Sequence, residues 1–127
     1  MDETRSCTVG DCLAVLEAAY HPSWAEEWDA VGLTAGSPAD PVRRVHFAVD
    51  PTEAVAAEAV SAGAQLLVTH HPLFLRGVRG IAETSSAGRV VTTLVRGVGA
   101  LCTAHTNADV ARPGGSDALA DVLGLVD

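Results

Sequence analysis

Long apolar runs are missing from this sequence, and so is any cysteine pattern typical of a disulfide-rich or zinc-ribbon protein. No window approaches the roughly 18 apolar residues that indicate a membrane span, and residues 1–5 lack the features of a signal peptide. Cys7, Cys12 and Cys102 are odd in number and form no Cys-x-x-Cys pair. We therefore predict a cytoplasmic protein without a membrane partner.

Positive charge and aromatic residues are also scarce. The sequence has 8 Lys and Arg residues against 16 Asp and Glu residues, which argues against a protein that binds nucleic acid or an anionic membrane. A carboxylate site that attracts cations fits this charge better. Aromatic residues make up only 4%, so the core must consist mainly of Ala, Val and Leu. A length of 127 residues, 48% of them apolar, suits one globular domain.

Three catalytic sequence motifs are absent. The sequence has no Gly-x-x-x-x-Gly-Lys, no Gly-x-Ser-x-Gly, and no Gly-x-Gly-x-x-Gly after a strand. These absences argue against a P-loop nucleotide site, a serine hydrolase and a dinucleotide-binding fold. Cys102 lies in a short apolar segment, so we interpret it as a core residue and not as a nucleophile.

The order of the predicted elements indicates an α/β fold. After a first helix over 8–20 and a short strand over 31–33, strands and helices alternate at 45–49, 51–62, 66–68, 85–97, 100–103 and 117–123. Helical crossovers between successive strands are typical of parallel pairing. The sequence therefore predicts a mostly parallel sheet with flanking helices.

Polar residues mark the expected helix starts. Thr8, with Asp11 three residues later, has the pattern of a capping box. Asp50 precedes a proline and is interpreted as the cap of the next helix, which explains it without a catalytic role. Ser116 is expected to cap the last helix. In the loop over 23–35, Trp24 is expected to be buried and to fix the loop against the core.

Two adjacent histidines end the central predicted strand. The apolar run 66–68 lies between a glycine and a proline and is typical of a strand buried on both faces. Pro72 stops this strand directly after His70 and His71. Open α/β sheets form their binding sites at such carboxyl ends. Taken alone, His-His-Pro is more often a turn than a metal site.

Polar residues follow two further predicted strands, at Asp50 and at 105–109, where the sequence is His-Thr-Asn-Ala-Asp. Parallel strands bring these residues to one edge of the sheet. Imidazole and carboxylate groups are ligands of zinc, iron, manganese and nickel. Adjacent residues of a strand point to opposite faces, so His70 and His71 can serve two ions with Asp109 between them, which is an arrangement for hydrolysis.

Other polar residues have two interpretations each. His21 is interpreted as a helix-end residue and His46 as a surface strand residue, and neither is a predicted ligand. Asp29 follows a tryptophan and precedes a short strand, so it is either a loop residue or a partly buried functional acid. Arg76 and Arg79 lie in the loop after the histidine strand and belong either to a solvated loop or to a site for an anionic substrate.

Four motifs follow one another along the sequence. They are Trp-Asp-Ala-Val-Gly-Leu at 28–33, Ala-Val-Asp-Pro-Thr at 48–52, Gly-Ala-Gln-Leu-Leu-Val-Thr-His-His-Pro-Leu at 63–73, and His-Thr-Asn-Ala-Asp at 105–109. In this order and spacing they resemble the motifs of the Nif-three-like dinuclear metal family, also labelled GTP cyclohydrolase type 1 homologue. The resemblance covers nearly the whole chain. The sequence departs from the family at Ala30, where Asn is usual, and at Ala108, where Leu is usual.

The resemblance implies a metal site and a catalytic group. It implies that His70, His71 and Asp109 bind two divalent ions and that His105 is a proton-transfer or supporting group beside them. We expect Asp29 to lie near the ions without binding them. The family takes its remaining ligands from a His-x-x-x-Glu in a second half, which these 127 residues lack. Residues 1–127 therefore correspond to an N-terminal half with a single α/β domain.

Our first hypothesis for the function is a metal-dependent hydrolase that acts on a nucleotide or phosphoester, although the resemblance itself fixes no substrate. The substrate is a small molecule, and it is anionic if Arg76 and Arg79 contribute to its site. The negative net charge predicts no direct binding of nucleic acid. The resemblance also implies a toroidal homohexamer. Two alternatives stay open at the level of sequence. One is a non-catalytic metal-binding scaffold or regulator, and the other is an inactive fragment.

Overall fold

The computed structural model describes residues 6–97 and 99–126. The first residues, used above against a signal peptide, and the last residue of the predicted domain lie outside this range. Within it, β1 (Gly32–Ala35), β2 (Val45–Ala48), β3 (Leu66–Thr69) and β4 (Ala100–Thr103) form a four-stranded sheet in the order β1-β4-β3-β2. Strands β2, β3 and β4 are parallel, and β1 pairs antiparallel with β4. The predicted mostly parallel sheet is confirmed.

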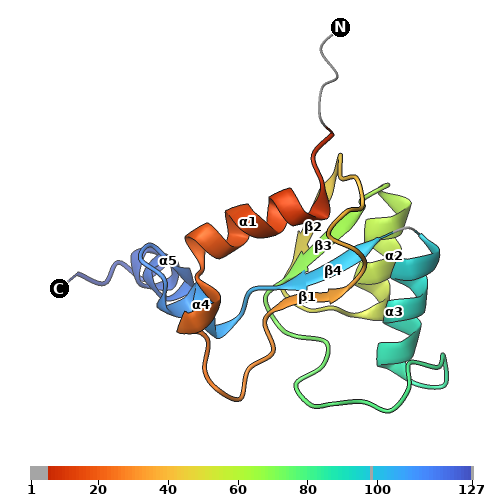
Figure 1. Ribbon diagram of the computed structural model, residues 1–127. Coiled ribbons are helices and arrows are strands. Elements are labelled where there is room, and N and C mark those ends of the chain that lie inside the picture. Colours follow the sequence, from red (N-terminus) through yellow and green to blue (C-terminus); the bar gives the residue numbers. More distant parts are fainter. Residues whose placement is uncertain (1–5, 98, 127) are drawn as a thin grey trace, which may run out of the picture.

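Helices cover both faces of this sheet (Figure 1). Helices α2 (Glu53–Ser61) and α3 (Ser86–Arg96) lie side by side on one face, and α1 (Val9–Ala19) lies on the other. Strands β3 and β4 are buried along their whole length, as the apolar runs predicted. Cys102 is 3% exposed, which confirms it as a core residue.

The two faces of the sheet have separate cores. Alternate residues of β3 and β4 point to opposite faces, so each strand contributes to both cores. The core under α2 and α3 consists of Ala56, Ala59, Ala64, Leu67, Val90, Leu94 and Leu101. The core under α1 consists of Val9, Val42, Leu66, Val68, Ala100 and Cys102. Small and aliphatic side chains therefore fill both cores, as the composition predicted.

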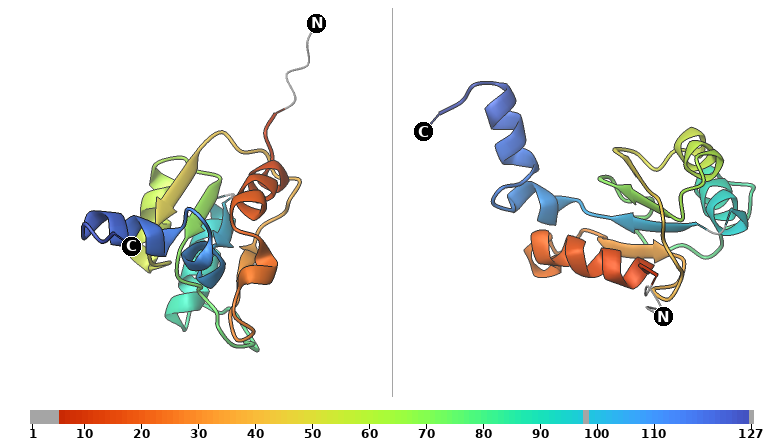
Figure 2. Two further views of the ribbon diagram at one scale, coloured as in Figure 1. Left: turned by 90° about the vertical axis from the view of Figure 1, so that its left-hand side faces the viewer. Right: turned by 90° about the horizontal axis from the view of Figure 1, so that it is seen from above.

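The C-terminal part leaves the body of the sheet. Helix α4 (Thr106–Val110) follows β4, and α5 (Gly115–Val122) packs on α4 and projects away from the strands (Figure 2). The sequence did not predict α4. Ser116 is not the cap of α5, because the helix begins at Gly115, two residues before the predicted start, and the N-cap is Gly114, whose N–H donates to the Asp117 carboxylate.

Two further predictions were wrong. The N-cap of α2 is Thr52, whose hydroxyl accepts a hydrogen bond from the Val55 N–H at 3.2 Å, so Asp50 does not cap this helix. Trp24 lies in the short 3-10 helix η1 (Pro22–Trp24) and is 48% exposed, so it does not fix its loop from inside the core. The capping box of Thr8 and Asp11 at the start of α1 is present as predicted.

Candidate metal centre

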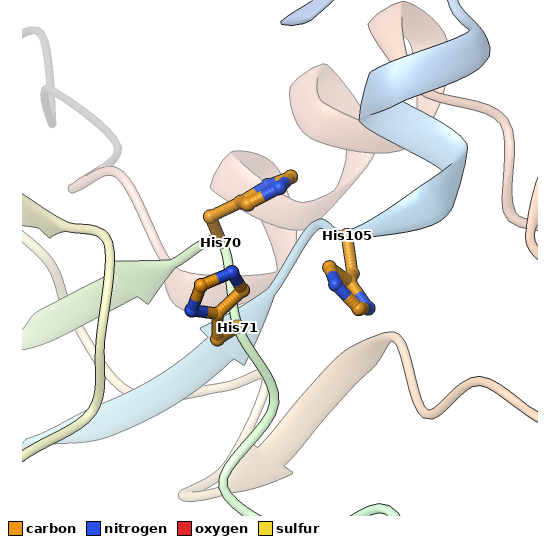
Figure 3. A group of neighbouring side chains, drawn as sticks. All are labelled: His70, His71 and His105. Carbon is orange, nitrogen blue, oxygen red and sulfur yellow. The ribbon is translucent and has the colours of Figure 1, made fainter.

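Three histidines meet where β3 and β4 end (Figure 3). His70 and His71 directly follow β3, and His105 lies between β4 and α4. The two strands are parallel neighbours in register, with Thr69 opposite Thr103, so their carboxyl ends lie side by side. The imidazole rings of His70 and His105 are 5.1 Å apart between centroids, and those of His71 and His105 are 5.5 Å apart.

The hydrogen bonds between β2 and β3 continue past the ends of both strands. The His70 N–H donates to the Ala48 carbonyl at 3.2 Å, and the His71 N–H donates to the Val49 carbonyl at 2.9 Å. This continuation brings Asp50 beside His71, with 2.6 Å between Asp50 Oδ1 and His71 Nδ1. Asp50 therefore belongs to the histidine cluster and is not a helix cap.

His70 is oriented by the main chain of the neighbouring strand. Its Nδ1 lies 2.9 Å from the Ala104 carbonyl oxygen. A carbonyl oxygen only accepts, so Nδ1 carries the hydrogen and donates it. The other ring nitrogen, Nε2, lies 3.3 Å from Asp109 Oδ1. A nitrogen lone pair and a carboxylate oxygen at this distance repel each other unless a proton or a cation lies between them.

His105 is oriented by a buried carboxylate. Its Nδ1 lies 2.9 Å from Asp29 Oδ1, and the Asp29 side chain is 0% exposed. Asp29 also accepts hydrogen bonds from the Ala30 N–H at 2.8 Å, the Thr106 N–H at 3.1 Å and the Thr106 hydroxyl. Burial alone would raise the pKa of Asp29, but the hydrogen bonds from Thr106 and His105 lower this pKa to about 2. The carboxylate is therefore ionised and fixes the hydrogen of His105 on Nδ1.

Helix α4 places His105 and Asp109 one turn apart, at its N-cap and in its first turn. The start of α4 is fixed by Asn107, which is 4% exposed. Its side-chain oxygen accepts from the His105 N–H, and its side-chain nitrogen donates to the Tyr20 carbonyl, both at 2.9 Å. The end of α1 thus holds the helix that carries two residues of the cluster.

These contacts leave one nitrogen of each ring available. In all three histidines Nδ1 binds an oxygen, namely Ala104 O, Asp50 Oδ1 or Asp29 Oδ1. One ring nitrogen from each of His70, His71 and His105 lies within 4.8 Å of the others. Metal-binding histidines usually donate their second N–H to a carboxylate or carbonyl in this way. The cluster therefore has the donors and the orientation to hold a metal ion.

Comparison with known proteins identifies the family. The family profile described as Duf34/NIF3 (NGG1p interacting factor 3) matches residues 7–127. The chain belongs to this DUF34/NIF3 family. It is 51% identical over 117 residues to the GTP cyclohydrolase 1 type 2 homolog of Streptomyces coelicolor, and the match covers 92% of this chain and 41% of that protein. It is 49% identical over 120 residues to the homolog of Mycobacterium tuberculosis, with 94% and 31% covered.

Solved structures agree with this assignment. A crystal structure of a Bacillus cereus protein related to NIF3 matches 98% of this chain over 34% of its own length, with a TM-score of 0.91 and 34% identity.

This DUF34/NIF3 chain spans only 31% to 41% of the length of the two curated relatives above. Within residues 6–97 and 99–126, none of the helices has both the length and the apolar character needed to span a membrane.

The remaining candidates of this DUF34/NIF3 chain lie outside the cluster. His46 was predicted to be a surface strand residue, but its side chain is only 22% exposed, with Nε2 3.7 Å from Glu58. His21 directly follows the C-cap of α1, and its Nδ1 is 2.7 Å from the Ser23 hydroxyl. Arg76 and Arg79 are exposed in the loop after His71. The sequence placed Asp50 at this edge of the sheet but interpreted it as a helix cap and not as a partner of a histidine. Extension of the parallel register by two residues beyond Ala48 and Thr69 sets Asp50 opposite His71.

Proposed function

We propose that this DUF34/NIF3 chain provides part of a dinuclear divalent metal centre, with His70, His71 and Asp109 as ligands. The observation that carries the proposal is that His70 and His71 each contact an oxygen through Nδ1, which leaves Nε2 to bind a metal ion, and that Asp109 Oδ1 lies 3.3 Å from His70 Nε2. Three carboxylates, those of Asp29, Asp50 and Asp109, contact these rings. With neutral imidazoles they give the centre a negative charge that attracts cations.

The ligands divide between two ions. His70 and His71 are adjacent in the sequence, so we assign them to different ions, with Asp109 as the bridge. The 3.3 Å between His70 Nε2 and Asp109 Oδ1 supports a common ion for these two residues. Nitrogen and oxygen donors without thiolate suit zinc, iron, manganese or nickel.

The reaction we propose is hydrolysis of a nucleotide or another phosphoester. When bound, a pair of divalent ions polarises a phosphoryl oxygen and activates water at neutral pH. His105 has the catalytic role of moving a proton through Nε2, because its Nδ1 hydrogen is held by Asp29. Arg76 and Arg79 are exposed and follow His71 closely in the sequence. Their positive charge would attract an anionic substrate. The names of the curated relatives also point to nucleotide chemistry.

The complete centre needs residues beyond this chain. We propose that residues 1–127 form the N-terminal half of a longer protein whose second half supplies the His-x-x-x-Glu ligands. The matches to less than half of the curated relatives support this reading. The homohexamer and the cytoplasmic location are further proposals that follow from the resemblance.

Two measurements test the function. The first is metal content by elemental analysis after loading with manganese or zinc and dialysis. The second is turnover of a panel of nucleotides and phosphoesters by this chain and by a longer chain that bears His-x-x-x-Glu. We expect turnover by the longer chain, and a loss of about 100-fold or more in its His105→Gln variant with metal retained. Substitution of Arg76 and Arg79 by Gln should weaken substrate binding and leave metal content unchanged.

A non-catalytic scaffold or regulator is the second candidate. It is favoured by the small number of ligands in this chain, since His70, His71 and Asp109 provide at most two protein ligands for each ion. Metal retained by the longer chain, without turnover of any substrate in the panel, would support the scaffold and contradict the hydrolase.

A further inference from the structure

Two cysteines outside the metal centre are in contact at the start of α1. The sulfur atoms of Cys7 and Cys12 lie 3.7 Å apart. Cys7 is exposed and Cys12 is partly buried, and both are free thiols. The metal centre does not use them, and neither the fold nor the family description assigns them a role.

The capping of α1 produces this contact. Thr8 is the N-cap, so Cys7 and Cys12 occupy the positions before the cap and four residues after it, called N′ and N4. Side chains at these two positions commonly touch and fix the entry of the chain into a helix. The Thr8 N–H donates to the Asp11 carboxylate at 2.9 Å, and the Asp11 N–H donates to the Thr8 hydroxyl at 3.2 Å. These bonds hold the turn between the two cysteines.

Residues 40–42 also hold the main chain from Cys7 to Val9. The Val42 N–H donates to the Cys7 carbonyl at 2.7 Å, and the Val9 N–H donates to the Asp40 carbonyl at 2.9 Å. The sulfur atoms are now in van der Waals contact, whereas a disulfide bond is about 2.05 Å long. A rotation of the two side chains must therefore bring the sulfur atoms closer before the bond forms. The backbone already has the two side chains facing each other.

We propose that Cys7 and Cys12 form a redox pair that closes to an intramolecular disulfide by exchange with a low-molecular-weight disulfide. The exposed Cys7 thiolate attacks one sulfur of the small disulfide, whose S–S bond breaks and releases one thiolate. The Cys12 thiolate then attacks the Cys7 sulfur of the mixed disulfide and releases the second thiolate. Two protein thiols are oxidised, the small disulfide is reduced to two thiols, and these take up the two protons.

Cys102 is an internal control. It is 3% exposed, and burial raises its pKa to about 11. Both effects keep its thiol protonated and out of reach of a reagent in the folded chain. Burial and the neighbouring Cys7 also raise the pKa of Cys12. Cys7 attacks first and Cys12 second, because Cys7 is exposed to the reagent and Cys12 is partly buried.

The experiment is oxidation of the folded chain by glutathione disulfide, followed by intact mass, peptide mapping and thiol titration. We expect the three free thiols to fall to one, with a loss of two hydrogen atoms and a Cys7–Cys12 crosslink. The Cys102→Ala variant should form the same crosslink. The Cys12→Ser variant should stop at a glutathione adduct on Cys7. In urea, all three thiols should react with an alkylating reagent.

Three results would overturn the proposal. One is a stable glutathione adduct on Cys7 while Cys12 stays a free thiol, because the second exchange then fails. Another is a crosslink between two chains in place of the intramolecular one. The third is equal reactivity of Cys102 and Cys7 in the folded chain.

Discussion

Nδ1 of His71 lies 2.6 Å from Oδ1 of Asp50, although the two residues are 21 positions apart in the sequence. The contact joins the ends of β2 and β3 and orients the His71 ring. A carboxylate that accepts the Nδ1 hydrogen makes Nε2 a better electron donor to a metal ion. Asp50 is therefore a supporting residue of the proposed centre, without being one of its ligands.

The first prediction concerns this contact. We expect Asp50→Asn to lower the affinity for zinc or manganese by about 10-fold to 100-fold, because the amide supports the His71 ring less well than a carboxylate. Isothermal titration of the metal-free chain measures the effect. Asp121→Asn on the exposed surface of α5 removes the same charge and is the matched control. Equal loss of affinity in both variants would mean that net charge, and not this contact, determines binding.

The second prediction concerns acid stability. The pKa of Asp29 is about 2 in the folded chain, against 3.8 for the unperturbed group, so the unfolded chain binds more protons between these values. The stability from Asp29 is fully present above pH 3.8 and is lost as pH falls toward 2. We expect Asp29→Asn to cost about 1–3 kcal/mol of unfolding free energy at neutral pH, because buried donors lose their acceptor. As pH falls from 3.8 to 2, the unfolding free energy of the variant should also decrease less steeply than that of the unsubstituted chain. Urea unfolding at several pH values tests both effects, and a parallel pH profile for the two proteins would contradict the assignment.

The third prediction concerns the start of α3. A Cβ atom on Gly88 would lie 1.9 Å from the Ala82 carbonyl oxygen, whereas one on Gly80 would meet nothing within 4 Å. Alanine normally favours a helix over glycine by about 0.5–1 kcal/mol, so the clash decides the sign here. We expect Gly88→Ala to destabilise the chain by about 1–3 kcal/mol and Gly80→Ala to have little effect. Thermal unfolding of the two variants provides the comparison.

Much of the sheet was predictable from sequence because its signals are local. The apolar runs of β3 and β4 and the helices between strands determine parallel order without knowledge of distant contacts. The position of His70, His71 and 105–109 at the sheet edge follows from that order. Helix α4 was missed because its five residues are too few to show a helical period.

The errors arose where distant contacts decide. Asp50 and Thr52 both precede a helix and both have side chains suited to capping, so the sequence alone does not choose between them. The neighbouring strand decides, because its continuation brings His71 beside Asp50. The exposure of Trp24 likewise depends on what packs near it. A large aromatic residue in a loop predicts burial only if the fold provides a cavity for it.

The last prediction is that this chain alone binds metal weakly. Catalytic zinc ordinarily has three protein ligands, whereas His70, His71 and Asp109 give each of two ions at most two. Support from Asp29 and Asp50 orients the rings but adds no ligand. We therefore expect a chelator to strip the metal from the 127-residue chain and a longer chain with His-x-x-x-Glu to retain it. Elemental analysis after dialysis against chelator measures this difference.

The histidine variants complete this test. His71→Ala should remove metal from the longer chain, and His46→Ala should not, because His46 contacts Glu58 outside the cluster. If the 127-residue chain kept stoichiometric metal in the presence of chelator, the proposal that its centre is incomplete would be wrong, because the ligands of this chain would then suffice. Unchanged metal content in His71→Ala would instead contradict the role of His71. The two outcomes are independent, so the measurement separates an error in the completeness of the site from an error in its ligands.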